Sequence, residues 1–282
     1  MFGVFLCSMK NKIAIQGIKG SYHHEVAAQL FGTALSLDEC LSFDALAASV
    51  TSKVTEAGVM ALENSIAGSI IPNYALIDKN DLHIVAEAYI RIEHQLMALA
   101  GTKINDITEV ASHPMALLQC KDFFATQPHI KLIEDADTAE VAQRIAKNQI
   151  KGLGAIASKT AAQLYGLDIV APNIHSIANN ATRFVVVKTE ANTSEDIDKA
   201  SLKFVLDHKR GSLAAVLNVL SDCKLNLTKI QSMPVVETPW KYSFFVDVTF
   251  DEVTFYTKAV QLLEIMTESL KVLGTYKNKL SA

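Results

Sequence analysis

Through the first two-thirds of the chain, short apolar runs alternate with capped helical segments. Lys12–Gln16 has isoleucine at the alternate positions 13 and 15 and a pattern typical of a strand, and a turn with two glycines follows at Gly17–Gly20. Ser21 is then a suitable N-cap for a helix over Tyr22–Phe31, whose alanine-rich interior favours that conformation. The apolar run Val59–Leu62 is typical of a buried parallel strand. Strands that alternate with helices in this way predict an α/β fold with helical crossovers.

The same strand–cap–helix order recurs further along the chain. Extended segments are expected around His83–Ile90 and Gln95–Ala100. They are followed by Val110–Ala111 with a helix from Pro114 to about Ala125, by Ile130–Ile133 with Asp137 and a helix to Lys147, and by Gly154–Ala157 with Ser158 and a helix ending near Gly166. In α/β sheets, ligands bind beyond the carboxyl ends of strands, at helix N-termini. The polar residues at these strand ends are therefore candidates for a binding site.

A polar, turn-rich segment, Glu190–Lys199, predicts a linker. After it, strand, helix, strand, strand, helix and strand are expected at Ser201–Asp207, Ser212–Asp222, Asn226–Val236, Tyr242–Phe250, Phe255–Leu270 and Lys271–Tyr276. This order is the split, ferredoxin-like βαββαβ plan. A domain of about 80 residues has a modest core, so we expect it to gain stability from dimerisation.

Charge and cysteine usage exclude several classes of protein. The formal net charge of −4 favours neither nucleic acid nor an anionic membrane as a partner. The four cysteines are far apart and form no CxxC pair, which argues against a disulfide framework or a zinc site. Phe2–Cys7 is apolar but too short for a membrane helix, and no basic residue precedes it as in a signal peptide. We therefore expect a cytoplasmic protein, with Met9 as an alternative start.

Common cofactor motifs do not match the sequence. His23-His24-Glu25 would need a second histidine at position 28 to make HExxH, and Ala28 stands there. The sequence has no GxGxxG and no P-loop, and no GxSxG surrounds Ser65. We expect no metal site.

Six stretches resemble the prephenate dehydratase family in their order and residues. They are GIKGSY (17–22), LENSIAGS (62–69), SHPMALLQC (112–120), DTAEVA (137–142), GAIASKTAAQLYGL (154–167) and NNATRF (179–184). The resemblance extends over residues 12–276. It implies a two-lobed catalytic region similar to periplasmic binding proteins at 10–190, with lobe one at 10–85 plus 176–190 and lobe two at 86–175. It also implies a linker at 191–200 and an ACT-type regulatory domain at 201–282.

The resemblance implies that the chain converts prephenate to phenylpyruvate, carbon dioxide and water without a cofactor. In the family the threonine of the Thr-Arg-Phe element is tied to catalysis, and Thr182 matches it. A hydroxyl can donate a hydrogen bond to the departing oxygen. It is a weak acid, so it needs precise positioning or a relay, and Glu63 is a candidate for that relay. From its pattern alone, Thr182 is interpreted as a β-branched residue entering a strand at Phe184–Val187.

Substrate binding is expected from polar residues of the same stretches. Arg183 offers a planar fork that suits a carboxylate, and a buried structural ion pair is an equal alternative. The other candidates are Ser21, Asn64, Ser65, Ser158, Asn180 and Phe184. Serine and asparagine also cap helices, and both roles can hold at once. Several positions depart from the family pattern. Among them, His23 replaces a small polar residue, which we expect to alter the pocket rim, and Met115 stands where glutamine is common.

The ACT resemblance implies that L-phenylalanine is an effector. The candidate effector-binding residues are Gly211, Ser212, Leu213, Asn226, Leu227, Gln231 and Ser232. Gln231 and Met233 stand where the family usually has glutamate and arginine, which removes charge-assisted hydrogen bonds worth about 1.5–3 kcal/mol each. Weaker feedback is one expectation, and a domain that serves chiefly for dimerisation is the other.

Two other functions remain open at this stage. Arogenate dehydratase would perform the same elimination on the amino analogue, and a non-catalytic amino-acid sensor would use the same cleft without turnover. The resemblance also implies a homodimer or homotetramer.

Overall fold

The computed structural model describes residues 12–207, 209–235, 238 and 240–280. Its first sheet contains the strand on which Thr182 lies. Its strands are β1 (Lys12–Gln16), β2 (Ser36–Cys40), β3 (Ala57–Asn64), β4 (Gly68–Ser69), β5 (His83–Arg91) and β11 (Ala181–Lys188). They are ordered β2-β1-β3-β11-β5, with β4 paired to β3. The helices α1 (Tyr22–Phe31), α2 (Phe43–Thr51) and α3 (Ile71–Lys79) connect them. The parallel pairs of β1 with β2 and β3 are as expected for crossovers.

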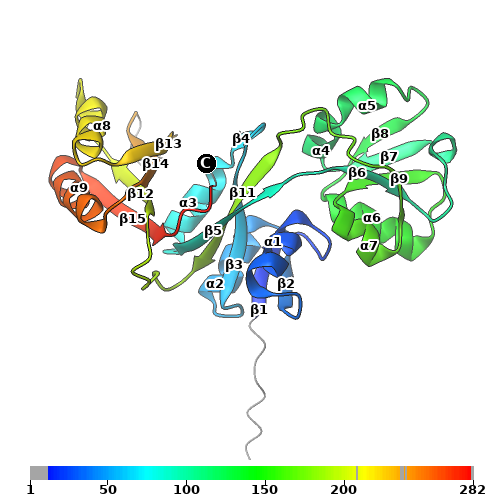
Figure 1. Ribbon diagram of the computed structural model, residues 1–282, viewed down its shortest axis with the longest axis horizontal. Coiled ribbons are helices and arrows are strands. Elements are labelled where there is room, and N and C mark those ends of the chain that lie inside the picture. Colours follow the sequence, from blue (N-terminus) through cyan, green and yellow to red (C-terminus); the bar gives the residue numbers. More distant parts are fainter. Residues whose placement is uncertain (1–11, 208, 236–237, 239, 281–282) are drawn as a thin grey trace, which may run out of the picture. The chain divides into compact units, whose positions relative to one another are not determined.

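A second sheet is formed by the segment of the chain between β5 and β11. It is ordered β10-β6-β9-β7-β8 and contains β6 (Gln95–Ala98), β7 (Glu109–Ser112), β8 (Lys131–Glu134), β9 (Leu153–Ala157) and β10 (Asp168–Ala171). Its helices are a short 3₁₀ turn (Ile104–Asp106), α4 (Pro114–Gln119), α5 (Lys121–Ala125), α6 (Thr138–Asn148) and α7 (Lys159–Tyr165). One face packs against α4 and α5 and the other against α6 and α7 (Figure 1). The two sheets give the two-lobed α/β architecture that the sequence predicted.

Helix caps explain why the helices begin where they do. The side chains of Ser21, Asp137 and Ser158 accept hydrogen bonds from backbone N–H groups in the first turns of α1, α6 and α7. One expected helix is interrupted: the segment from Pro114 to Ala125 breaks at Cys120 into α4 and α5.

The C-terminal sheet has the predicted βαββαβ order. It contains β12 (Lys199–Val205), α8 (Ser212–Asp222), β13 (Asn226–Pro234), β14 (Tyr242–Thr249), α9 (Val253–Met266) and β15 (Ser269–Tyr276). The strands are ordered β13-β14-β12-β15, and each neighbouring pair is antiparallel. Both helices cover the same face of the sheet and enclose one apolar core (Figure 1).

Two compact units divide the chain differently from the predicted domains. One comprises Met1–Ser69 and Tyr89–Phe184, and the other comprises Ile70–Ala88 and Val185–Ala282. The second unit includes α3 because the Lys203 ammonium lies 2.5 Å from the Asp78 carboxylate and the Tyr74 ring lies 5.5 Å from that of Phe245. The predicted domain ends at residues 10 and 282 lie outside the described residues.

Lys199, which the sequence assigned to the linker, is the first residue of β12. Its side chain is buried against Glu87 of β5. In the part of the chain that the structure describes, no helix has the length and apolar character to span a membrane.

Candidate functional site

Thr182 and Asn64 lie side by side on the neighbouring strands β11 and β3. The Asn64 Nδ2 donates to Thr182 Oγ1 at 3.0 Å and to Asn180 Oδ1 at 2.6 Å. The Asn64 Oδ1 accepts from the backbone N–H groups of Ile66 (3.0 Å) and Ala67 (2.8 Å). Because a backbone N–H can only donate, these two bonds fix which end of the Asn64 amide faces Thr182.

This arrangement leaves the Thr182 hydroxyl hydrogen available. Its oxygen accepts a hydrogen bond from Asn64, and no acceptor for its O–H is found among the described residues. The side chain is 7% exposed. A donor held in this way, and already accepting one hydrogen bond, is a stronger donor to a third group.

The hydrogen bonds continue from Asn180 into the second lobe. Asn180 Nδ2 donates to Gln119 Oε1 at 2.9 Å, and His94 Nε2 lies 2.9 Å from the same oxygen. The Tyr22 hydroxyl lies 3.1 Å from His94 Nδ1. A continuous chain of polar contacts therefore joins Thr182 to Tyr22.

A cavity of about 460 Å³ borders this chain. Gln119 and Asn180 belong to both. The remaining lining residues are Ile66, Ala67, Met115, Leu118, Lys121, Asp122, His175, Ser176 and Ile177. Small-molecule sites commonly have volumes of about 300–1,000 Å³ and combine apolar walls with a few polar groups. The cavity is therefore the candidate substrate site, and Met115 is on its wall.

Burial keeps the His94 and His23 side chains neutral. It lowers the pKa of His94 to about 4 and that of His23 to about 3. It also raises the pKa of the Tyr22 phenol well above its ordinary value. The hydrogen-bonded chain is thus built from neutral groups, and Lys121 and Asp122 add charged side chains to the cavity wall.

The three predicted serines have structural contacts. Ser21 caps α1 and Ser158 caps α7, and Ser158 also donates to the Gly20 carbonyl at 2.8 Å. Both are almost fully buried. Ser65 donates to the Asn179 carbonyl and accepts from the Ala181 N–H, which ties the Glu-Asn-Ser turn to β11. None of the three lines the cavity.

Glu63 and Arg183 do not lie with Thr182. Asn64 reaches Thr182, so these two side chains share one face of the sheet. Glu63 precedes Asn64 on β3, and Arg183 follows Thr182 on β11. Because side chains alternate between faces of a sheet, both point away from the face that carries Thr182.

Phe184 shares the face of Thr182. Its ring packs edge-on against that of His23, with centroids 4.9 Å apart. His23 is buried and its Nε2 accepts from the Ala61 N–H at 3.3 Å. The expectation that His23 alters the pocket rim is therefore wrong: it satisfies a buried backbone donor.

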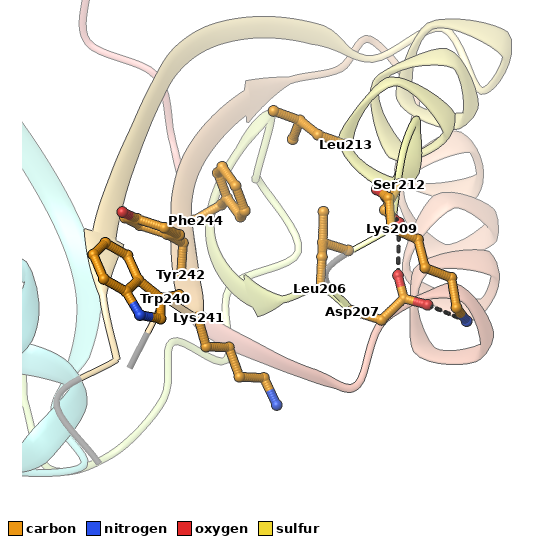
Figure 2. A pocket seen from close by; sticks show the side chains of 9 residues that line it. All are labelled: Leu206, Asp207, Lys209, Ser212, Leu213, Trp240, Lys241, Tyr242 and Phe244. Atoms are coloured by element: carbon orange, nitrogen blue, oxygen red, sulfur yellow. Dashed lines mark hydrogen bonds and ion pairs between the residues drawn. The ribbon is translucent and has the colours of Figure 1, made fainter. Parts of the chain in front are cut away.

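The predicted effector residues fall into two groups. Gly211 has a left-handed backbone (φ 86°) before α8, and the adjacent Ser212 donates to the Asp207 carboxylate at 2.6 Å. Ser212 and Leu213 line a hollow of about 140 Å³ together with Leu206, Asp207, Lys209, Trp240, Lys241, Tyr242 and Phe244 (Figure 2). The second group, Asn226, Leu227, Gln231 and Ser232, is on the edge strand β13 and does not line it.

Sequence reasoning missed Gln119, His94 and Tyr22 as site residues. Gln119 and Tyr22 lie within stretches that carried the family resemblance, so a signal for them was present. His94 lies outside all six stretches, and no local pattern marks it. Among the described residues, no group of three or more His, Cys, Asp and Glu side chains is arranged to hold a metal ion.

Comparisons with known proteins agree on one family. The family model for prephenate dehydratase matches residues 13–192. Arogenate dehydratase/prephenate dehydratase 2 of Arabidopsis thaliana, a chloroplastic protein, is 34% identical over 94% of this chain and 72% of its own length.

Two solved structures share the fold over most of both chains. One is GqqA, described as a novel type of quorum-quenching acylase, with 27% identity, a TM-score of 0.86 and coverage of 95% of this chain and 98% of its own. The other is the prephenate dehydratase of Arthrobacter aurescens in complex with L-Phe, with 22% identity, a TM-score of 0.85 and coverage of 95% and 90%. By the family model and the Arabidopsis relative, this chain belongs to the prephenate dehydratase family.

Proposed function

We propose that this chain is a cytoplasmic prephenate dehydratase that converts prephenate to phenylpyruvate. The observation that carries the proposal is the Thr182 hydroxyl, oriented by Asn64 and joined through Asn180 to the wall of the 460 Å³ cavity. Family membership supplies the reaction class. Thr182 does not itself line the cavity, but its hydroxyl is joined by Asn64 to Asn180, which does.

The reaction needs little from the enzyme besides positioning. The bond between the ring and its carboxylate breaks, carbon dioxide leaves, and the electron pair enters the ring. The ring becomes aromatic as the C4–O bond breaks, and the leaving hydroxide takes one proton to become water. Thr182 would donate its hydrogen bond to this oxygen as negative charge develops on it.

The substrate oxygens would be held by neutral amides and by Lys121. Gln119 and Asn180 border the cavity and Lys121 adds a positive charge to its wall. Glu63 and Arg183 point to the other face of the sheet, which favours a structural role for both over the predicted relay and carboxylate-binding roles. Ser21, Ser65 and Ser158 would support the site by capping helices and fixing the turn after β3.

The test is phenylpyruvate formation from prephenate by the purified protein, compared with Thr182→Val and Thr182→Ser. Valine keeps the shape and removes the hydroxyl, and we expect kcat to fall by about 100-fold or more, as for loss of a general-acid group. Serine keeps the hydroxyl and should retain more activity. Equal rates for valine and wild type would exclude the role of Thr182.

Three other outcomes are distinguished by the same preparation. Turnover of arogenate in preference to prephenate would identify an arogenate dehydratase. Binding of an aromatic amino acid without turnover of either would identify a sensor. Because GqqA is described as a quorum-quenching acylase, removal of an acyl group from a quorum signal is measured in parallel, and activity there alone would reject the dehydratase.

We further propose that residues 10–190 are the catalytic region. Residues 201–282 would then be an ACT-type regulatory domain that binds L-phenylalanine. The βαββαβ order supports this, as does the hollow at Ser212 and Leu213, whose wall combines aromatic rings with Asp207 and Lys209. We also propose that the chain forms a homodimer or homotetramer. Asn226, Leu227, Gln231 and Ser232, on the edge strand β13, do not line the hollow of their own chain.

A further inference from the structure

The hydrogen bonds from Asn64 to Tyr22 have one permitted direction. The backbone N–H groups of Ile66 and Ala67 make the Asn64 oxygen the acceptor, so the Asn64 nitrogen donates to Asn180 Oδ1. The Asn180 nitrogen must then donate to Gln119 Oε1. The orientation of three successive amides is thus set by two backbone groups.

The same argument fixes the protonation of His94. Gln119 Oε1 cannot donate, so the His94 Nε2 at 2.9 Å must carry the hydrogen. A neutral imidazole carries only one, and so Nδ1 is an acceptor. The Tyr22 hydroxyl lies 3.1 Å from Nδ1 and also 3.1 Å from the Glu93 carbonyl. It is the group placed to donate to Nδ1, and its single hydrogen is shared between these two acceptors.

The Gln119 side-chain nitrogen, Nε2, takes no part in this network of hydrogen bonds. Gln119 Oε1 already accepts two hydrogen bonds, and no acceptor for Gln119 Nε2 is found among the residues that the structure describes. The side chain is half-buried and lines the cavity.

We propose that Tyr22 and His94 are positioning residues that hold the Gln119 amide with its N–H groups toward the cavity, where they bind an oxygen of the anionic substrate. The inference rests on the proposed function for the identity of the ligand. The orientation of Gln119 itself rests only on the hydrogen bonds. If His94 carried its hydrogen on Nδ1, its Nε2 and the Gln119 Oε1 would be two acceptors in contact. The Gln119 amide would then turn over to donate to Nε2, and its oxygen would face the anionic substrate.

Two substitutions at His94 separate the roles of its nitrogens. In His94→Gln the new Nε2 takes the place of the imidazole Nε2 and can still donate to Gln119. In His94→Asn the amide occupies the place of Nδ1 and the donor to Gln119 is lost. We expect KM for prephenate to be at least about tenfold higher in His94→Asn than in His94→Gln, with kcat differing by less than about threefold, because ground-state binding is what the Gln119 donor supplies.

A third variant tests Gln119 directly. Gln119→Glu can accept the same two hydrogen bonds but presents no N–H to the cavity, so KM should rise with little change in thermal stability. Equal KM values for His94→Asn and His94→Gln would overturn the positioning role.

The tautomer is measured without turnover. In ¹⁵N-histidine NMR spectra, the signal that disappears in His94→Gln should show hydrogen on Nε2 and none on Nδ1, and Tyr22→Phe should shift it toward the other tautomer. A hydrogen on Nδ1 in the wild type would overturn the inference. A wild type with the Nε2–H tautomer that does not turn over prephenate would reject the proposed function while supporting the orientation of Gln119.

Discussion

The Lys199 ammonium nitrogen lies 2.9 Å from a carboxylate oxygen of Glu87, and both side chains are almost completely buried. The Lys279 backbone N–H donates to the same carboxylate at 3.0 Å. A buried ion pair contributes little compared with well-packed apolar residues, but removal of one partner leaves a desolvated charge. This pair therefore joins β12 of the C-terminal sheet to β5, and removal of either side chain alone should destabilise the protein.

Replacement of Lys199 by methionine should destabilise the protein by about 3–5 kcal/mol, because the Glu87 carboxylate loses its ammonium partner inside the protein. Urea unfolding measures the change. Lys199→Met combined with Glu87→Leu should recover most of the stability. Lys277→Met, which removes solvent-accessible ion pairs with Asp196 and Asp198, is the control and should change little. A similar result for Lys199→Met and Lys277→Met would contradict the prediction.

Asn64→Asp tests whether Asn64 orients Thr182. Aspartate can still accept from the Ile66 and Ala67 N–H groups but cannot donate to the Thr182 hydroxyl, which would instead turn its hydrogen toward the new carboxylate. We expect kcat for prephenate to fall about tenfold or more, a part of the effect of a general-acid group. Steady-state kinetics measure the change. Ser65→Ala is the control and should mainly affect stability, so the comparison separates orientation of Thr182 from support of the turn after β3. Unchanged kcat in Asn64→Asp would reject this orienting role.

The two buried histidines predict loss of stability in mild acid. Their pKa values in the folded protein are about 3 for His23 and about 4 for His94, below the ordinary value near 6.5. Between those limits the unfolded chain binds more protons than the folded chain. Stability is therefore fully present above pH 6.5 and falls by about 1.4 kcal/mol per pH unit for each histidine as pH decreases toward the folded pKa.

Urea unfolding at pH 7.5, 6.0 and 5.0 measures this slope. In His23→Gln the new side chain can accept from the Ala61 N–H but does not titrate. Its overall stability should be lower, because the contact with the Phe184 ring is lost, but its dependence on pH should be weaker by the contribution of one histidine. Identical slopes in the variant and the wild type would show that His23 is not the group responsible.

Trp240 should report effector binding. It is the only tryptophan in the sequence, it is 81% exposed, and it lines the hollow beside Ser212 (Figure 2). Addition of L-phenylalanine should shift its fluorescence to shorter wavelength as the indole loses water. Asp207→Asn should weaken binding by about tenfold or more, because a hydrogen bond to the ligand ammonium is worth about 1.5–3 kcal/mol. Asp222→Asn, at the far end of α8, is the matched control. An unchanged spectrum at saturating phenylalanine would remove the effector proposal.

Elements with strong local signals were predictable to the residue. Lys12–Gln16, Tyr22–Phe31 and Ser212–Asp222 have the predicted bounds, because a turn or a helix start marks each of them. The sequence did not predict β2, α2, β4, α3, the 3₁₀ turn at Ile104–Asp106 or β10. β2 is an edge strand with mostly half-buried residues and so lacks an apolar run, and α3 begins at Ile71 after an N-cap residue, Ile70, whose side chain makes no capping hydrogen bond.

Tertiary pairing decided other boundaries. The final helix was expected to continue to Leu270, but Ser269 and Leu270 pair with Val205 and Phe204 of β12 and belong to β15. The site shows the same limit. Asn64, Asn180 and Thr182 were identified from motifs, but the contact of Gln119 with His94 depends on how two distant segments pack, and a local pattern holds no information about it.

The position of β11 has a consequence for biosynthesis of the protein. β11 is inserted between β3 and β5, yet it is the last strand of that sheet in the chain. The Asn64–Thr182 contact spans 118 residues, and such long-range closures are slow, late events in folding. A nascent chain that has completed its second lobe still has an open first sheet and no oriented hydroxyl. Catalytic competence would therefore arise late, when the polypeptide returns to the sheet with which it began.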